Sequence, residues 1–140
     1  MIFIAHRGNT DGPRPEKENK QDYILDAIQK GYDVEIDIWA DKKLWLGHDK
    51  PQYKVDLKFL TKNFNKLWIH CKNLEAIDIL SEFSLFNFFW HQNDDFTLTS
   101  KNFVWTYPGK SVCNKSVLVL DNARQYSGQS CFGLCSDYLV

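Results

Sequence analysis

Two hydrophobic periods alternate along the first ninety residues. The segment Asp33–Ile38 places apolar side chains at every second position, which is typical of a strand with one buried face. Residues 20–30 repeat their apolar positions at helical spacing, and the glycine that follows favours the end of a helix. Applied along the chain, these two periods predict strands over residues 2–5, 33–38, 44–46, 66–72 and 87–91, and helices over residues 20–30, 56–62 and 73–83.

The helical period disappears after His91. Four short apolar or aromatic segments remain, joined by only three to eleven residues, at 96–99, 103–107, 117–120 and 132–135. A crossover between parallel strands usually takes a dozen or more residues, so either extended loops return the chain or some segments pair in antiparallel fashion. Because strands that alternate with helices favour a parallel sheet, we predict an α/β fold with helices in the first half and mostly loops in the second half.

Length and composition indicate a single domain over residues 1–140. Apolar residues make up 44% of the chain and aromatic residues 15%, which excludes intrinsic disorder. The net charge of -1 gives no basis for nonspecific nucleic-acid binding or for a polybasic membrane anchor. No apolar run reaches the roughly 20 residues of a spanning helix, and the start lacks the basic segment of a signal peptide. We therefore expect a cytoplasmic protein without a stable membrane anchor, in which the four cysteines are reduced thiols.

Charged and histidine side chains gather where the predicted strands of the first half end. Glu35 and Asp37 lie two residues apart on one strand, so both carboxylates project to the same face. In parallel α/β folds, active sites form at the carboxyl ends of the strands. The side chains expected to meet there are His6, Arg7, Glu35, Asp37, His48, His70 and Lys72.

This set of side chains suits the cleavage of a phosphodiester. Arg7, Lys72 and a divalent cation would neutralise the anionic phosphoryl oxygens, which otherwise repel a nucleophile. Glu35 and Asp37 offer the hard oxygen ligands that Mg²⁺ and Ca²⁺ prefer. Two histidines can divide the proton transfers, because one accepts a proton or attacks while the other protonates the leaving oxygen.

Several segments resemble the glycerophosphodiester phosphodiesterases, which belong to the wider superfamily of phosphatidylinositol-specific phospholipases C. The resemblance rests on IAHRGN with its His-Arg-Gly motif, ENK, GYDVEIDIW with its Glu-x-Asp motif, and LWLGHD. LWIHCK is similar to the family's strand that carries Glu-x-Lys, and GLCSDYLV resembles its last strand. The combination at these spacings is more specific than any one of the motifs.

The resemblance implies a shortened TIM-barrel-like fold and metal-dependent hydrolysis of glycerophosphodiesters. It assigns His6 and His48 as the catalytic pair. Arg7 and Lys72 would contact the phosphate of a small-molecule substrate.

The resemblance also implies that Glu35 and Asp37 hold the divalent cation, which would be Mg²⁺, Ca²⁺ or Mn²⁺. The family's third metal carboxylate falls on His70, where a neutral imidazole can still ligate but removes one negative charge. That change should weaken Ca²⁺ binding and favour a metal that tolerates nitrogen, such as Mn²⁺ or Zn²⁺. The chain is also short, because a full barrel takes about 250 residues. The barrel would be incomplete, or completed by a partner chain in a homo-oligomer.

Some side chains near these motifs allow two interpretations. His70 fits either a metal ligand or a hydrogen-bonded interior histidine, and Glu18 fits either a partner of Arg7 or a helix cap. A rim or core position is the simpler interpretation of three further rings, those of His91, Trp105 and Tyr107. Two aspartates that also end predicted strands receive no role, Asp121 and Asp137.

Three functions remain open on the sequence alone. The first is a metal-dependent phosphodiester hydrolase with a two-histidine acid–base mechanism. The second is a related lyase-type enzyme that uses an internal substrate hydroxyl and releases a cyclic phosphate. The third is a catalytically inactive domain that binds a phosphorylated ligand, which the histidine at position 70 and the shortened second half favour.

Overall fold

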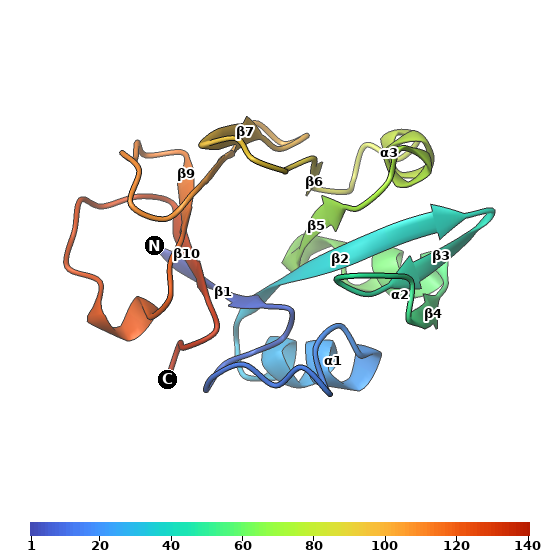
Figure 1. The fold of residues 1–140 in the computed structure, drawn as a ribbon, viewed down its shortest axis with the longest axis horizontal. Helices are drawn as coiled ribbons and strands as arrows, with labels where there is room; N and C mark the ends of the chain where they lie inside the picture. The colour runs from blue at the N-terminus through green and yellow to red at the C-terminus, as the bar shows by residue number, and fades with distance from the viewer.

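The computed structural model describes residues 1–140 and contains ten strands, three short α-helices and two 3-10 turns (Figure 1). The strands are β1 (Ile2–His6), β2 (Asp33–Asp41), β3 (Lys43–Leu46), β4 (Tyr53–Val55), β5 (Leu67–Cys71), β6 (Phe88–Phe89), β7 (Phe96–Leu98), β8 (Val104–Thr106), β9 (Ser116–Val119) and β10 (Gly133–Ser136). The helices are α1 (Gln21–Gln29), α2 (Leu57–Lys62) and α3 (Leu74–Ser81), and the 3-10 turns are η1 (Phe64–Lys66) and η2 (Ala123–Gln125).

The prediction of an α/β fold shaped like a shortened TIM barrel is wrong. All ten strands belong to one mixed sheet, and the three helices are too few and too short to cover it in the manner of an α/β barrel. The physical reason is the connections, because β2, β3 and β4 pair antiparallel through turns, as do β7 and β8. Antiparallel neighbours need no helical crossover, so the sheet grows without adding helices.

Seven strands of the mixed sheet are nevertheless parallel to their neighbours, in the order β6-β5-β2-β1-β10-β9-β8. The long strand β2 makes this order possible, because its first residues pair with β1 and its last residues pair with β3. Along its other edge, β2 pairs with β5 over Val34–Ile38. The carboxyl ends of these parallel strands therefore lie on one side of the sheet.

The helices of the first half begin where the sequence predicts. The Asp56 side chain accepts a hydrogen bond from Phe59 N at 2.8 Å and caps α2. Asn73 caps α3 in the same way, through Ala76 N at 3.2 Å. Each predicted helix lies within two residues of the observed one, because capping residues and an apolar face act locally.

The predicted strands differ more from the observed ones. The strand at 33–38 continues to Asp41 and turns into a hairpin, β4 is an additional strand, and β6 is reduced to two residues. Both alternatives for the second half occur. Loops return the chain between the parallel strands β8, β9 and β10, whereas β7 pairs antiparallel with β8.

The hydrophobic core is divided unequally between the two halves. A cluster of 17 buried residues packs α1, α2 and α3 against the first half of the sheet. A cluster of only four buried residues, Leu118, Ala123, Cys131 and Leu134, lies under the loops of the second half. A third cluster, which we call the interior layer, takes one residue from each of six parallel strands: Ile4, Trp68, Phe89, Trp105, Val117 and Cys135.

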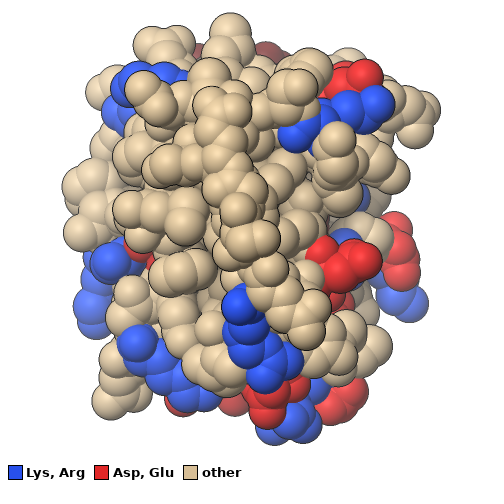
Figure 2. All heavy atoms as spheres, turned by 90° about the vertical axis from the view of Figure 1, so that its left-hand side faces the viewer, with Lys and Arg blue, Asp and Glu red and all other residues tan.

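The outer surface also differs between the halves. In Figure 1 the helices lie on the right, whereas β9, β10 and their loops form the left side. Figure 2 shows this left side as a face built mostly of uncharged residues, with charged side chains mainly at its margins. None of the three helices has the length and apolar character needed to cross a membrane.

Candidate active site

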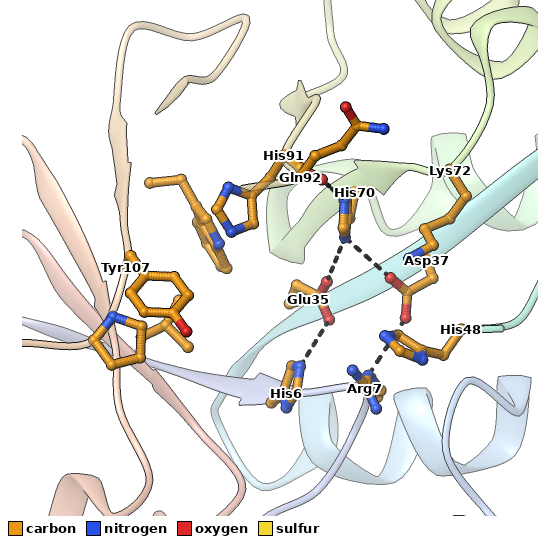
Figure 3. A pocket seen from close by; sticks show the side chains of 13 residues that line it. His6, Arg7, Glu35, Asp37, His48, His70, Lys72, His91, Gln92 and Tyr107 are labelled. Atoms are coloured by element: carbon orange, nitrogen blue, oxygen red, sulfur yellow. Dashed lines mark hydrogen bonds and ion pairs between the residues drawn. The ribbon is translucent and has the colours of Figure 1, made fainter. Parts of the chain in front are cut away.

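A cavity of about 450 Å³ lies at the carboxyl ends of the parallel strands (Figure 3). Its volume is within the range of small-molecule sites, roughly 300–1,000 Å³. All seven residues predicted from the sequence line this one cavity, namely His6, Arg7, Glu35, Asp37, His48, His70 and Lys72. The tertiary structure therefore brings together side chains that are up to 66 positions apart, 72 minus 6.

The period of the strands explains why these side chains meet. Residues two apart on a strand share a face, so the residue two positions beyond each member of the interior layer points the same way, one level closer to solvent. This relation links Ile4 to His6 and Trp68 to His70. The interior layer thus forms an apolar floor, and the polar side chains stand above it.

Two buried carboxylates form the centre of the cavity. The side chains of Glu35 and Asp37 are 4% and 1% exposed, respectively. Glu35 Oε1 and Asp37 Oδ1 are buried and have no hydrogen-bond partner. A buried carboxylate oxygen without a partner is costly, so this pair fits a bound cation or proton.

His70 completes a group of three metal-binding side chains. Its Nδ1 lies 3.2 Å from Asp37 Oδ1 and 3.8 Å from Glu35 Oε2. Its Nε2 lies 3.0 Å from the His91 carbonyl oxygen, which can only accept, so Nε2 carries the proton and Nδ1 presents a lone pair when the ring is neutral. The three ligand atoms lie within 4.8 Å of one another, a spacing that a single divalent cation can bridge. A histidine whose other nitrogen donates to a carbonyl is also the usual arrangement of a metal ligand.

Asp37 is held in place from its other side. Asn19 Nδ2 donates to Asp37 Oδ2 at 2.9 Å, and Asn19 Oδ1 accepts from the backbone N of Asp37 at 3.0 Å. Arg7 Nε lies 3.5 Å from the same Oδ2 atom, and Arg7 Nη1 donates to Glu18 at 3.2 Å. Glu18 therefore serves as a partner of Arg7 rather than as a helix cap.

The turn after β1 aims Arg7 into the cavity. Arg7 itself has a φ of 55°, and Gly8 follows with a φ of 92°. A Cβ atom on Gly8 would lie 2.7 Å from Tyr23 Cδ2, so only glycine allows this close approach. The glycine of the His-Arg-Gly motif thus serves the geometry of the site.

The first histidine of the cavity is held by the end of the chain. His6 Nδ1 lies 2.9 Å from Asp137 Oδ1, which also accepts from Asn9 Nδ2 at 2.8 Å. His6 Nε2 consequently faces the cavity, 4.0 Å from Glu35 Oε1. Burial lowers the pKa of His6, but the Asp137 hydrogen bond and the Glu35 charge raise that pKa above its ordinary value. The pKa of Asp137 is lowered, because contact with His6 outweighs the effect of burial.

The second histidine lies on the more open side of the cavity. His48 Nδ1 lies 2.8 Å from Asp49 Oδ1, and the His48 side chain is 40% exposed. Burial and the nearby Arg7 charge lower the pKa of His48. Relative to a free imidazole, the environment therefore stabilises the neutral form of His48 and the protonated form of His6.

The two carboxylates also differ in their acidity. Burial, together with the charge of Asp37, raises the pKa of Glu35. Burial acts on Asp37 as well, but the adjacent His70, Asn19 and Arg7 lower its pKa. Without a cation, Glu35 is therefore the carboxylate that takes up a proton more readily.

Several cavity residues were not assigned from the sequence. His91, Trp105 and Tyr107 line the cavity, although a rim or core position was the simpler interpretation. Asp137 received no role and does not line this cavity, yet it contacts His6. The spacing of two from the interior layer would have identified His91, Tyr107 and Asp137, because they follow Phe89, Trp105 and Cys135. This spacing can be used only when the strand pairing is known, because the local sequence of a three-residue strand does not show which of its faces points inward.

No protein-family model matches this chain, and no curated protein or solved structure matches it either. The functional argument therefore rests on the residues and geometry of the cavity and on the sequence motifs that line it.

Proposed function

We propose that this protein is a metal-dependent phosphodiester hydrolase that acts on glycerophosphodiester-like substrates. The observation that carries the proposal is the buried acidic pair, whose partnerless oxygens face His70 Nδ1 and His6 Nε2. The resemblance of the strand-end motifs to glycerophosphodiester phosphodiesterases supports the same reaction. This chemistry needs two histidines for proton transfer, positively charged side chains for the phosphate and carboxylates for a metal ion. The cavity contains all three kinds of group.

Glu35, Asp37 and His70 are the residues that would hold the divalent cation. The fit rests on their unpaired oxygens and on the free Nδ1 of His70. When bound, such a cation supplies Lewis-acid stabilisation of the phosphoryl oxygens and lowers the pKa of a bound water. The nitrogen ligand favours Mn²⁺ over the more oxygen-dependent Ca²⁺.

The positive side chains would position the phosphate. Arg7 is fixed by Glu18 and Asp37, so its guanidinium loses little freedom when an anion binds. Lys72 lines the same cavity, and its backbone N donates to Ile38 O at 2.8 Å, which ties the end of β5 to β2. Arginine would bind the phosphate as a planar fork and lysine as a point charge.

The two histidines differ in a way that suggests their roles. When two groups have pKa values shifted in opposite directions, the environment itself separates acid from base. His6, with a raised pKa, would protonate the leaving oxygen from Nε2, and His48, with a lowered pKa, would accept a proton at Nε2. Asp137 and Asp49 orient the rings, because each contacts the Nδ1 atom.

Hydrolysis of bis(p-nitrophenyl) phosphate tests the proposal. We expect turnover by the chelator-treated protein after addition of Mn²⁺, Mg²⁺ or Ca²⁺. Glu35→Gln should lower the rate on the order of 10³-fold, because a metal ion contributes several kcal/mol to such a reaction. Glu82→Gln is the matched control, since Glu82 is exposed after α3 and does not line the cavity.

Two outcomes would change the assignment. Absence of turnover with every metal would favour a domain that only binds a phosphorylated ligand. With a glycerophosphodiester as substrate, phosphorus NMR would distinguish an open monoester from a cyclic phosphate. The cyclic product would identify a lyase-type reaction.

A further inference from the structure

We infer that a separate cavity at the amino ends of the parallel strands binds an adenine nucleotide. This cavity, which we call the amino-end cavity, has a volume of about 450 Å³ and lies at the opposite end of the strands from the candidate active site. Its volume is within the range of small-molecule sites. The inference goes beyond the proposed phosphodiesterase, because no residue lines both cavities.

The starts of the parallel strands form most of the amino-end cavity. Trp68 lines it as well and belongs to the interior layer, whereas Trp105 of the same layer lines the candidate active site. The interior layer therefore lies between the two cavities. Six lining residues are the first residue of a parallel strand or the residue just before it, namely Ile2, Asp33, Leu67, Asn87, Phe103 and Phe132.

Aromatic rings give the amino-end cavity a surface on which a flat base can stack. The rings of Phe103 and Phe132 lie 4.3 Å apart, and the Trp68 ring lies 5.1 Å from the Phe103 ring. Phe64 of η1 adds a fourth ring, which is 41% exposed. Proteins hold nucleobases by stacking them on such side chains, because every base has a flat apolar face.

The one carboxylate of the amino-end cavity is already neutralised. Asp33 is the only acidic residue that lines it. Asp33 Oδ1 lies 3.2 Å from Lys66 Nζ, and Asp33 Oδ2 accepts a hydrogen bond from Trp68 Nε1 at 3.0 Å. Both oxygens are therefore occupied, and this carboxylate offers no partner to a cationic ligand.

Two further lysines leave the amino-end cavity positively charged. Lys101 lines the cavity, and its Nζ donates to the carbonyl oxygen of Ser84, which is a neutral acceptor. Lys115 Nζ lies 5.0 Å from the centre of the Phe103 ring. Neither ammonium group lies within ion-pair distance of a carboxylate. An anionic group, such as a phosphate, would supply the missing opposite charge.

Asn87 can pair with the edge of the base. It lines the amino-end cavity, and its Oδ1 is buried without a hydrogen-bond partner. An unpaired buried acceptor is costly, and an amide turns easily about its last side-chain bond, so a ligand N–H can recruit this oxygen. Adenine presents an amino donor beside a ring-nitrogen acceptor, which an asparagine amide matches with two hydrogen bonds. The cavity therefore offers rings and an amide for the base and lysines for the phosphate.

Titration calorimetry with adenosine monophosphate (AMP) and chelator-treated protein tests the inference without turnover. We expect AMP to bind about 10-fold more tightly than adenosine, which lacks the phosphate. Phe64→Ala should weaken AMP binding about 5- to 100-fold, the range for the loss of one stacking contact. Lys101→Gln should weaken it about 3- to 10-fold. Lys58→Gln is the matched control, because Lys58 is exposed on α2 and lines neither cavity.

The contact of Asn87 with the base has its own test. Purine riboside monophosphate lacks the amino group of adenine, so the wild-type protein should bind it about 2- to 10-fold more weakly than AMP, the range of one neutral hydrogen bond. In Asn87→Ala the two ligands should bind equally. Amide NMR spectra of each variant confirm that the fold is retained.

Three outcomes would overturn the inference. The first is the absence of AMP binding at millimolar concentration, and the second is equal affinity of the wild-type protein for AMP and adenosine. The third is a loss of AMP affinity in Arg7→Gln but not in Lys101→Gln, because the phosphate would then bind in the candidate active site. None of these measurements uses phosphodiester cleavage, so they are decided independently of the proposed function.

Discussion

Residues 1–90 cover their strands with three helices, whereas residues 91–140 join their strands by loops. The first half contains the cluster of 17 buried residues, whereas the cluster under the loops of the second half has only four. The two halves nevertheless supply opposite walls of one cavity (Figure 3). The carboxylate, guanidinium and ammonium groups of the lining all come from the first half, and the second half contributes His91, Gln92, Trp105, Tyr107, Pro108 and Val119.

On the proposed function, this difference would separate the reactive groups from the surface that contacts the rest of the substrate. The proposed reactive groups lie on, or close to the ends of, strands of the first half, which pack against the 17-residue cluster. The wall of the second half stands on short strands and loops, where side chains can change at a smaller cost to stability. Asp137 is an exception, because it follows β10 in the second half but contacts His6 of β1 in the first half.

The largest expected effect is the loss of activity in His6→Gln. If the first half carries the chemistry, this change should lower the turnover of bis(p-nitrophenyl) phosphate about 10³-fold, within the usual range for a general acid. Circular dichroism should show an unchanged fold, since the side chain lies at the cavity surface. Retention of most of the activity would break the assignment of His6 as a proton donor.

Core truncations should show the unequal stability of the halves. Ile36→Ala removes a fully buried side chain from the 17-residue cluster, and we expect a loss of about 4 kcal/mol in the free energy of unfolding. Leu118→Ala acts in the four-residue cluster, where the loops can relax, and should cost about 2 kcal/mol. Urea unfolding measures both values. Equal losses would mean that the second half is packed as firmly as the first.

The metal preference should depend on the single nitrogen ligand. In His70→Asp, an all-carboxylate set should increase the affinity for Ca²⁺ relative to Mn²⁺ about 10-fold. Isothermal titration calorimetry measures both affinities without turnover. An unchanged ratio would show that His70 does not ligate the cation and instead serves as an interior partner of the acidic pair.

The smallest expected effect concerns the contact that joins the two halves. The lowered pKa of Asp137 adds stability above its ordinary value of 3.8, which is lost as the pH falls through the folded-state pKa. The raised pKa of His6 adds stability below 6.5, which is lost as the pH rises through the folded-state pKa. The pair should therefore contribute most between these two values. Asp137→Asn should cost about 1 kcal/mol near pH 5.5 and less near pH 9 in metal-free protein.

Urea unfolding at the two pH values measures this effect. Asp121→Asn is the matched control, because Asp121 is exposed after β9 and does not contact a histidine. A cost that is equal at both pH values would indicate that the Asn9 hydrogen bond, rather than the His6 contact, carries the contribution of Asp137.

The sequence by itself determined the local elements and the residues of the candidate site. The caps at Asp56 and Asn73, the apolar face of α1 and the alternation in β2 are short-range signals, so they predicted three helices and the first strands. The period of two in β2 and β5 placed Glu35 with Asp37, and His70 with Lys72, on shared faces.

Only the tertiary structure decided the mixed sheet and the second wall of the cavity. Strand pairing is a long-range choice, and Phe88–Phe89 or Val104–Thr106 alone are too short to reveal their partners or inward faces. The contact between His6 and Asp137 joins residues 131 positions apart and exists because β1 pairs with β10. Local propensity cannot encode such a contact, since it arises only when the two ends of the chain lie side by side in one sheet.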